Sequence, residues 1–245
     1  MLPRGPVDLL IILAVGLAAG TISGIVGFGS SIMLMPVLVI AFGPQQAVPV
    51  MTVAALLANA SRVAAWWREV QWRACATYAV TAVPAAALGA GTLVALPARL
   101  VELAIGIFFI AMIFVRRALE TRQQVIGPWQ LAFAGAIVGY LTGIVVSTGP
   151  ITAPIFLALG LVKGAFLATE AAASLAVYLA KAGTFRTLGA LPADAMVKGL
   201  IIGSTLMAGA FIAKRFVLKF EPRQFRLLMD GLMFVSGAAM IVAAW

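Results

Sequence analysis

The chain has 245 residues, of which 63% are hydrophobic and only 10% are charged. A soluble domain is about 25% charged, and a core of this size cannot bury so much apolar surface, so the composition excludes a soluble enzyme and indicates a polytopic membrane protein. The formal net charge of +9 comes from short basic clusters between apolar runs, which favours contacts with anionic lipid headgroups over nucleic-acid binding.

Eight apolar runs are long enough to cross about 30 Å of hydrocarbon as helices. In chain order they comprise residues 9–25, 47–67, 74–96, 101–115, 129–146, 165–185, 195–216 and 227–245. Two further runs, 32–42 and 151–161, are short, because a helix of that length covers about 16 Å. Each follows a stretch of helix breakers, Gly27-Phe28-Gly29-Ser30-Ser31 in the first case and Ser147-Thr148-Gly149-Pro150 in the second.

The basic residues indicate whether the two short runs cross the membrane or return to the side where they began. If they return, Lys and Arg divide about evenly between the two sides, against the positive-inside rule. If they cross as broken elements, the chain makes ten crossings and twelve of its 17 basic residues share one face. We therefore expect ten crossings, with both termini outside and the more basic face in the cytoplasm.

The chain repeats itself at an offset of 117 to 119 residues. A run with glycine at every fourth position, residues 16–24, matches another at 135–143, and Pro36 matches Pro154. Residues 1–118 form the first predicted repeat, 119–127 the linker and 128–245 the second repeat. Because five crossings are an odd number, the second repeat must be inverted. The predicted fold is an all-α inverted repeat of two five-crossing halves, each with one broken short helix, a pattern typical of secondary transporters.

Glycines spaced four residues apart allow helices to approach closely. We expect this packing role for the two repeated runs, and also for Gly89, Gly91, Gly199 and Gly203. The glycines inside the breaks differ, because the helix pattern stops there and backbone N–H groups are left without helical partners. These glycines are Gly27, Gly29 and Gly149.

The two breaks are predicted to bind an anion. A helix that begins near the bilayer midplane presents unpaired N–H groups and the positive end of its dipole. Ser30 and Ser31 begin one such helix, and Thr148, Gly149 and Pro150, preceded by Ser147, begin the other. Inversion would bring the two helix starts together around a small dianion or carboxylate. The alternative is that the Ser and Thr side chains cap these helices, which does not exclude an anion site.

Polar residues inside the long runs extend the predicted site. Thr52, Asn59 and Arg62 share one face of their helix. On the matching run of the second half, Glu170, Ser174, Tyr178 and Lys181 share one face, and Thr169 is the residue that corresponds to Thr52. Arg62 and Lys181 differ by 119 residues, so they form a pseudo-symmetric pair that attracts anions, or else each extends along its helix to the membrane interface. Thr52, Asn59, Arg62, Thr169, Tyr178 and Lys181 therefore join the candidate substrate ligands.

Glu170 is the only acid well inside a predicted span. An ionisable group in such a place indicates a function, because burying its charge is unfavourable. Three roles stay open for it. It carries a coupling proton, it neutralises Lys181, or it lies near the positive start of its own helix.

The arrangement resembles the TauE/SafE family of sulfite exporters and anion permeases. The resemblance rests on a Gly-x-x-x-Gly-x-x-x-Gly run that leads into a Gly-rich break, on a second copy that ends in Thr148-Gly149-Pro150, and on the loop Val70-Gln71-Trp72-Arg73. It covers essentially the whole chain. It implies export or uptake of sulfite, of sulfonates such as sulfoacetate, or of related small organic anions across a bacterial inner membrane.

We therefore expect a secondary transporter that binds a small sulfur oxyanion, organosulfonate or carboxylate between the two breaks and works by alternating access. Its expected partners are this anion and the lipid bilayer, with no nucleic acid, and its apolar outer surface permits a homodimer. An anion channel on the same fold and a scaffold without transport activity remain alternatives.

An intramembrane enzyme is disfavoured. The chain has no histidine for a Ser–His pair, and Asp8, Asp194 and Asp230 lie near the ends of runs. With no histidine and with Cys75 as the single cysteine, we expect no metal site and no cofactor.

Overall fold

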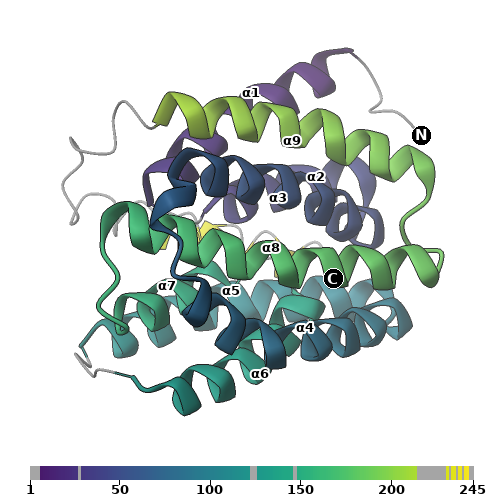
Figure 1. Ribbon diagram of the computed structural model, residues 1–245. Helices are drawn as coiled ribbons and strands as arrows, with labels where there is room; N and C mark the ends of the chain where they lie inside the picture. Colours follow the sequence, from purple (N-terminus) through teal and green to yellow (C-terminus); the bar gives the residue numbers. More distant parts are fainter. Residues whose placement is uncertain are drawn as a thin grey trace.

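The computed structural model describes residues 6–26, 29–121, 126–145 and 148–213, together with short pieces between 230 and 242. This part of the chain is helical and contains no strand. The helices are α1 (Pro6–Val26), α2 (Ser30–Phe42), α3 (Pro44–Trp66), α4 (Trp72–Ala95), α5 (Ala98–Thr121), α6 (Pro128–Ile144), α7 (Gly149–Leu157), α8 (Lys163–Thr187) and α9 (Ala193–Ala213) (Figure 1). A 3₁₀ turn, η1 (Trp67–Glu69), joins α3 to α4.

Among the described residues, five helices are long and apolar enough to cross a membrane. They span Gln45–Glu69, Trp72–Ala95, Ala98–Val115, Lys163–Thr187 and Ala193–Ala213. The length and composition of the described helices therefore support a helical membrane protein with several spans. About half of the predicted run 227–245 is described, as short helical pieces between 230 and 242.

The main difference from the predicted element boundaries concerns α5. Helix α5 continues to Thr121, beyond the predicted end of its apolar run at residue 115 and into the predicted linker. Charged Arg and Glu residues are good helix formers, so the helix outlasts its apolar stretch. The short helices begin at Ser30 and Gly149, at the residues predicted to start them.

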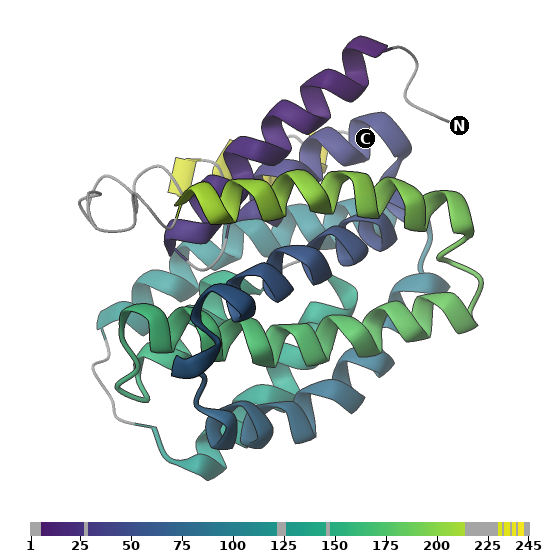
Figure 2. The ribbon, with the colours of Figure 1, turned by 45° about the horizontal axis from the view of Figure 1, so that its top comes forward.

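The helices form two tightly packed pairs on either side of a central pair. Helix α1 packs against α9 at one side of the molecule, and α6 packs against α4 at the opposite side (Figures 1 and 2). Helices α3 and α8 lie between them, with α3 against α9 and α8 against α4. Exchanging α1 with α6, α3 with α8 and α4 with α9 converts the α1–α9 pair into the α6–α4 pair. The same exchange converts the α3–α9 pair into the α8–α4 pair, so the contacts are symmetric.

The repeated glycines lie where the outer helices touch. A Cβ atom on Gly20 would lie 2.7 Å from the Cα of Leu206 in α9, and one on Gly139 would lie 2.6 Å from the Cα of Ala82 in α4. Such distances leave no room for any side chain, so the predicted packing role of these glycines is confirmed. Gly89 takes part in the contact between α4 and α6 in the same way.

Of the other glycines that were predicted to serve helix packing, some lie at close helix contacts and one does not. A Cβ on Gly199 would lie 2.8 Å from the carbonyl oxygen of Val50, and one on Gly203 would lie 3.0 Å from the Cα of Ala54, so both help α9 to pack against α3. The prediction for Gly91 is wrong, because no atom lies within 4 Å of the position that its Cβ would take. The face of α4 at Gly91 does not meet a neighbouring helix closely.

Candidate anion-binding site

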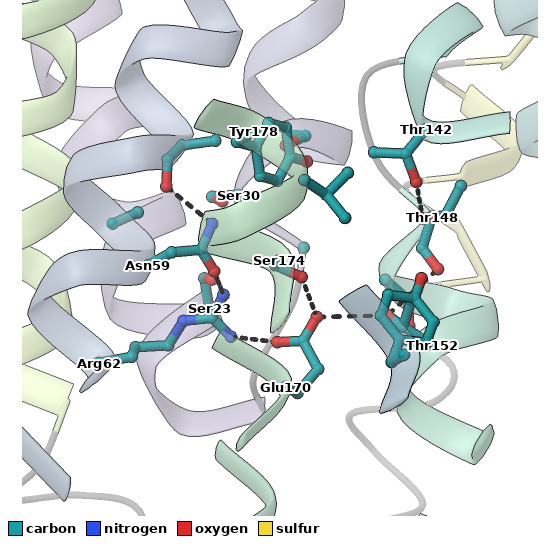
Figure 3. A pocket seen from close by; sticks show the side chains of 17 residues that line it. Ser23, Ser30, Asn59, Arg62, Thr142, Thr148, Thr152, Glu170, Ser174 and Tyr178 are labelled. Carbon is teal, nitrogen blue, oxygen red and sulfur yellow. Dashed lines mark hydrogen bonds and ion pairs between the residues drawn. The ribbon is translucent and has the colours of Figure 1, made fainter. Parts of the chain in front are cut away.

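A polar cavity with a volume of about 30 Å³ lies where α1, α2, α3, α4, α6, α7 and α8 converge (Figure 3). Because one water molecule needs roughly 10–15 Å³ by this measure, the cavity has room for about two waters or for one small anion. Both short helices begin at its wall. Its polar lining consists of Ser23, Ser30, Ser31, Asn59, Arg62, Tyr78, Thr142, Thr148, Thr152, Glu170, Ser174 and Tyr178.

Most of the predicted site residues line this cavity. They are Gly29, Ser30, Ser31, Asn59, Arg62, Thr148, Gly149, Glu170 and Tyr178. Three others do not line it, namely Thr52, Thr169 and Lys181. Gly27 and Ser147 lie outside the described residues. The structure therefore places residues from both breaks and from the two central helices around one cavity.

Helix α2 starts at the cavity from a glycine in a left-handed conformation. Gly29 has φ 112°, which a side chain would strain, and its carbonyl oxygen accepts the first helical hydrogen bond, from Met33 N at 3.1 Å. Ser30 and Ser31 lie in the first turn of α2, before Met33, the residue whose amide donates this bond. Their hydroxyls neither cap the helix nor bond to any described residue, so the expected capping role is wrong here. The helix start thus offers hydroxyl donors to a guest.

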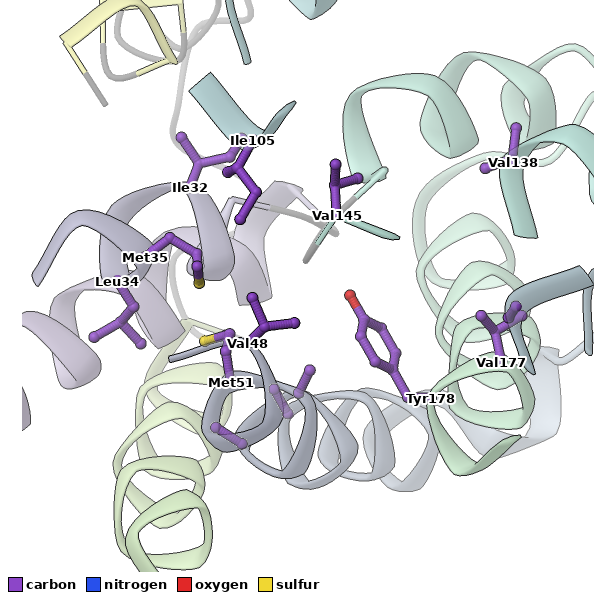
Figure 4. Close-up of a cluster of buried hydrophobic side chains, with 14 of the residues drawn as sticks. Ile32, Leu34, Met35, Val48, Met51, Ile105, Val138, Val145, Val177 and Tyr178 are labelled. Atoms are coloured by element: carbon purple, nitrogen blue, oxygen red, sulfur yellow. The ribbon is translucent and has the colours of Figure 1, made fainter. Parts of the chain in front are cut away.

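An apolar cluster holds α2 in the protein interior (Figure 4). Ile32, Leu34 and Met35 of α2 are fully buried, as are Val48 and Met51 of α3. Since removing such side chains from a close-packed core is unfavourable, α2 cannot turn its polar start away from the cavity without breaking these contacts.

The start of α7 is built differently from that of α2. Pro150 has no N–H, and the amides of Ile151 and Thr152 both donate to the carbonyl oxygen of Thr148, at 2.8 and 2.9 Å. The side chain of Thr148 makes no capping bond, so the capping expectation is wrong for α7 as well. The two breaks were predicted to present free amides in a symmetric way. They do not, because at the start of α7 Pro150 has no N–H and the amides of Ile151 and Thr152 are bonded to Thr148.

The hydroxyl of Thr148 lies 2.5 Å from that of Thr142, which itself donates to the carbonyl oxygen of Val138 at 2.7 Å. A hydroxyl has one proton, so Thr148 must be the donor to Thr142. Toward the cavity, Thr148 can then act only as an acceptor.

A buried ion pair crosses the cavity from α3 to α8. Nη1 of Arg62 lies 3.1 Å from Oε2 of Glu170, and Nη2 donates to the side-chain oxygen of Asn59. Oε1 of Glu170 accepts from the hydroxyls of Ser174, at 2.8 Å, and Thr152, at 3.2 Å. Both charged side chains are buried, with 7% of Arg62 and 4% of Glu170 exposed. Glu170 therefore neutralises Arg62 rather than Lys181, and Nε of Arg62 has no partner in the described part of the chain.

A family model described as "Sulfite exporter TauE/SafE" matches residues 12–240. The chain belongs to the TauE/SafE family. No curated protein and no solved structure matches it. Family membership makes the protein a membrane transporter of the sulfite-exporter and anion-permease type. Within its described residues, no group of three His, Cys, Asp or Glu side chains is placed to hold a metal ion.

Lys181 of this TauE/SafE protein binds the protein backbone, not the cavity. Its Nζ donates to the carbonyl oxygens of Thr142 and Val145 at 2.7 and 2.8 Å, where α6 ends, and the side chain is fully buried. A helix C-terminus leaves carbonyl groups unpaired at the negative end of the dipole, which explains this position of a cation. The side chains of Lys181 and Arg62 are both buried within the protein, so neither extends to the membrane interface.

Replacing Lys181 by Met should lower the free energy of unfolding by about 2–3 kcal/mol, because two buried carbonyl groups lose a charged donor. Chemical denaturation in detergent measures this loss. Lys163→Met, at an exposed position, is the control and should stay within about 0.5 kcal/mol of the parent protein. Equal stability of the two variants would show that Lys181 does not hold the end of α6.

Thr52 and Thr169, the matched threonines, make structural hydrogen bonds. The hydroxyl of Thr52 donates to the carbonyl oxygen of Val48 at 2.8 Å, and that of Thr169 accepts from the amide of Gln71 at 2.9 Å. Thr169 therefore fastens the connection between α3 and α4 to α8. Both side chains are fully buried.

Several lining residues were not predicted as ligands. Ser23 and Thr142 each precede the third glycine of a repeated run, at the same offset of 119 residues as Arg62 and Lys181, so the repeat contained a signal for them. Ser174 shares the helix face of Glu170. Tyr78 carried no such signal, because nothing in its apolar run distinguishes it from a residue of the core.

Proposed function

We propose that the cavity binds one small oxyanion, such as sulfite, an organosulfonate like sulfoacetate, or a small carboxylate, and that the protein carries it as a secondary transporter. The observation that supports this most is Arg62, a buried cation whose Nε has no partner among the described residues, at a cavity of about 30 Å³. A buried N–H group without an acceptor is unfavourable even where its charge is paired, and an oxyanion would supply the missing acceptor.

Neutral donors around Arg62 complete the proposed site. The hydroxyls of Ser23, Ser30 and Ser31 line the cavity and make no hydrogen bond to the described residues. Hydroxyl and backbone amide groups can bind an oxyanion without adding a second buried charge. On the α7 side, Thr148 presents acceptor lone pairs, which suits a guest that carries a proton or a hydroxyl. The anion would thus be held mainly from the side of α2 and α3.

The proposed transport cycle uses an inverted repeat. Residues 1–118 and 128–245 would form the two halves, joined by 119–127, and one repeat-derived unit would rock or slide against the rest. The matching glycine contacts in the α1–α9 and α6–α4 pairs support this symmetry. The proposed location is a bacterial inner membrane, and the apolar outer surface would also accommodate a second copy of the chain.

Thermal-shift measurements with sulfite and sulfoacetate test the site. Both anions should raise the melting temperature of the purified protein, because a ligand at one hundred times its Kd stabilises the folded state by about 2.7 kcal/mol. Ser31→Ala and Asn59→Ala should reduce the shift, the first by removing a free donor and the second by releasing Arg62. Thr148→Ala should reduce it less, since its proton is already donated within the protein.

Ser204→Ala is the matched control, because it removes a hydroxyl from an exposed position on α9. Its thermal shift should equal that of the parent protein. Full shifts in all three cavity variants would show that the site lies elsewhere. No shift of the parent protein with either anion would contradict the proposed function itself.

Flux through proteoliposomes distinguishes a carrier from a channel on the same fold. Saturable counterflow of labelled sulfite is expected, because a carrier exchanges one bound anion at a time. A single-channel conductance in planar bilayers would contradict the carrier.

A further inference from the structure

The cavity already contains an anionic group, the carboxylate of Glu170. Among the described residues that line the cavity, Glu170 is the only acid and Arg62 the only base. Their ion pair, at 3.1 Å, leaves the lining without net charge. A second anion that enters beside Glu170 therefore meets no excess of positive charge.

The contacts of Glu170 are those that an oxyanion guest would need. The carboxylate receives one guanidinium group, from Arg62, and two hydroxyls, from Ser174 at 2.8 Å and Thr152 at 3.2 Å. These donors come from three different helices, α3, α8 and α7. Figure 3 shows the carboxylate pointing between Arg62 on one side and Thr152 on the other. The carboxylate of Glu170 is therefore held by the same kinds of donor that would hold a bound oxyanion.

One buried guanidinium cannot compensate two buried anions. With Glu170 ionised, the entering anion would leave one negative charge uncompensated in a medium of low polarity, which is strongly unfavourable. A proton on the carboxylate removes this charge and releases Nη1 of Arg62. The protonated carboxyl group can still bond to the two hydroxyls.

We propose that Glu170 and the transported anion compete for Arg62, so that anion binding is coupled to the uptake of one proton by Glu170. The proton comes from the aqueous phase and is bound at the carboxylate, and the anion takes the place of the carboxylate beside the guanidinium. For a monoanion, the charge of the occupied cavity then equals that of the empty one. This inference rests on the proposed function and adds the coupling ion to it.

Few other titratable or charged groups lie near Glu170 in the part of the chain that the structure describes. Tyr78 of α4 and Tyr178 of α8 line the same cavity, and phenols stay neutral between about pH 5 and about pH 8. Helix α7 contributes the non-titrating Thr152. Lys181, further along α8, is bound to the end of α6, and Glu69 of η1 lies against Gly164. Glu170 can therefore be tested by a variant of its own.

Calorimetry with methanesulfonate measures the coupling, because a sulfonate stays ionised over this whole range. The full-length protein in detergent is titrated in two buffers with different ionisation enthalpies. Uptake of about one proton per anion is expected, and the apparent Kd should rise up to about tenfold per pH unit on the alkaline side. Glu170→Gln should take up no proton and bind with the same Kd at every pH, since its amide cannot ionise. Glu102→Gln, the same change at a residue of α5 away from the cavity, should behave as the parent protein.

Each outcome bears on a different claim. Binding by the parent protein without proton uptake overturns the coupling and leaves the proposed function intact. No binding of either methanesulfonate or sulfite at any pH overturns the proposed function as well. If Glu170→Gln melts like the parent protein but fails to bind, the carboxylate itself holds the guest and competition is wrong. If Glu170→Gln does not fold, the number of protons that the parent protein takes up per bound anion alone tests the proposed coupling.

Discussion

Replacing Arg62 by Met should lower the free energy of unfolding by about 3–5 kcal/mol and abolish anion binding. The loss arises because the buried carboxylate of Glu170, 4% exposed, would lose its guanidinium partner and keep only two hydroxyl donors. Denaturation in detergent measures the first effect, and the thermal shift with sulfite measures the second.

The double variant Arg62→Met/Glu170→Gln separates the two effects. With both charges removed, most of the lost stability should return, since replacing a whole buried pair is often close to neutral. Anion binding should not return, because the cation is gone. A double-mutant cycle gives the coupling energy directly. Arg73→Met, at an exposed position, is the control for loss of one charge. A double variant no more stable than Arg62→Met would contradict this account of the pair.

Alanine at Gly139 or Gly20 should destabilise the protein by about 3 kcal/mol or more, at the upper end of overpacking effects. In both places the new methyl group meets backbone atoms, the Cα of Ala82 at 2.6 Å and the Cα of Leu206 at 2.7 Å, so no side-chain rotation can relieve the clash. The measurement is the same detergent denaturation, together with the yield of folded protein.

Gly91→Ala is the matched control for these two variants. Nothing lies within 4 Å of its Cβ position, and alanine is the better helix former by about 1 kcal/mol, so this variant should be as stable as the parent protein or slightly more so. If Gly139→Ala were tolerated equally well, the close contact between α6 and α4 would not be needed for folding.

The sequence predicted the positions of the described helices because apolar length is a local property. It also located both breaks, since Gly29 and Pro150 act on the backbone at their own positions. It missed the extension of α5, because the charged residues after 115 end an apolar run without ending a helix.

The site was predicted less completely, for physical reasons. Arg62 and Glu170 are 108 residues apart, and their pairing depends on how α3 packs against α8, which a single sequence does not show. Lys181 occupies the position that matches Arg62, yet its Nζ reaches the end of α6 instead of the cavity. The direction of the proton between Thr148 and Thr142 likewise depends on a third partner, the backbone of Val138.

The glycine contacts have a consequence for movement. They join α1, from the first half of the chain, to α9, from the second, and they join α6 to α4 in the same crossed manner. Backbones in such close contact are expected to travel together. In the proposed cycle, the two moving units would then not coincide with the two halves of the chain. Each would combine helices from both halves, and the surface between them would run between α3 and α8.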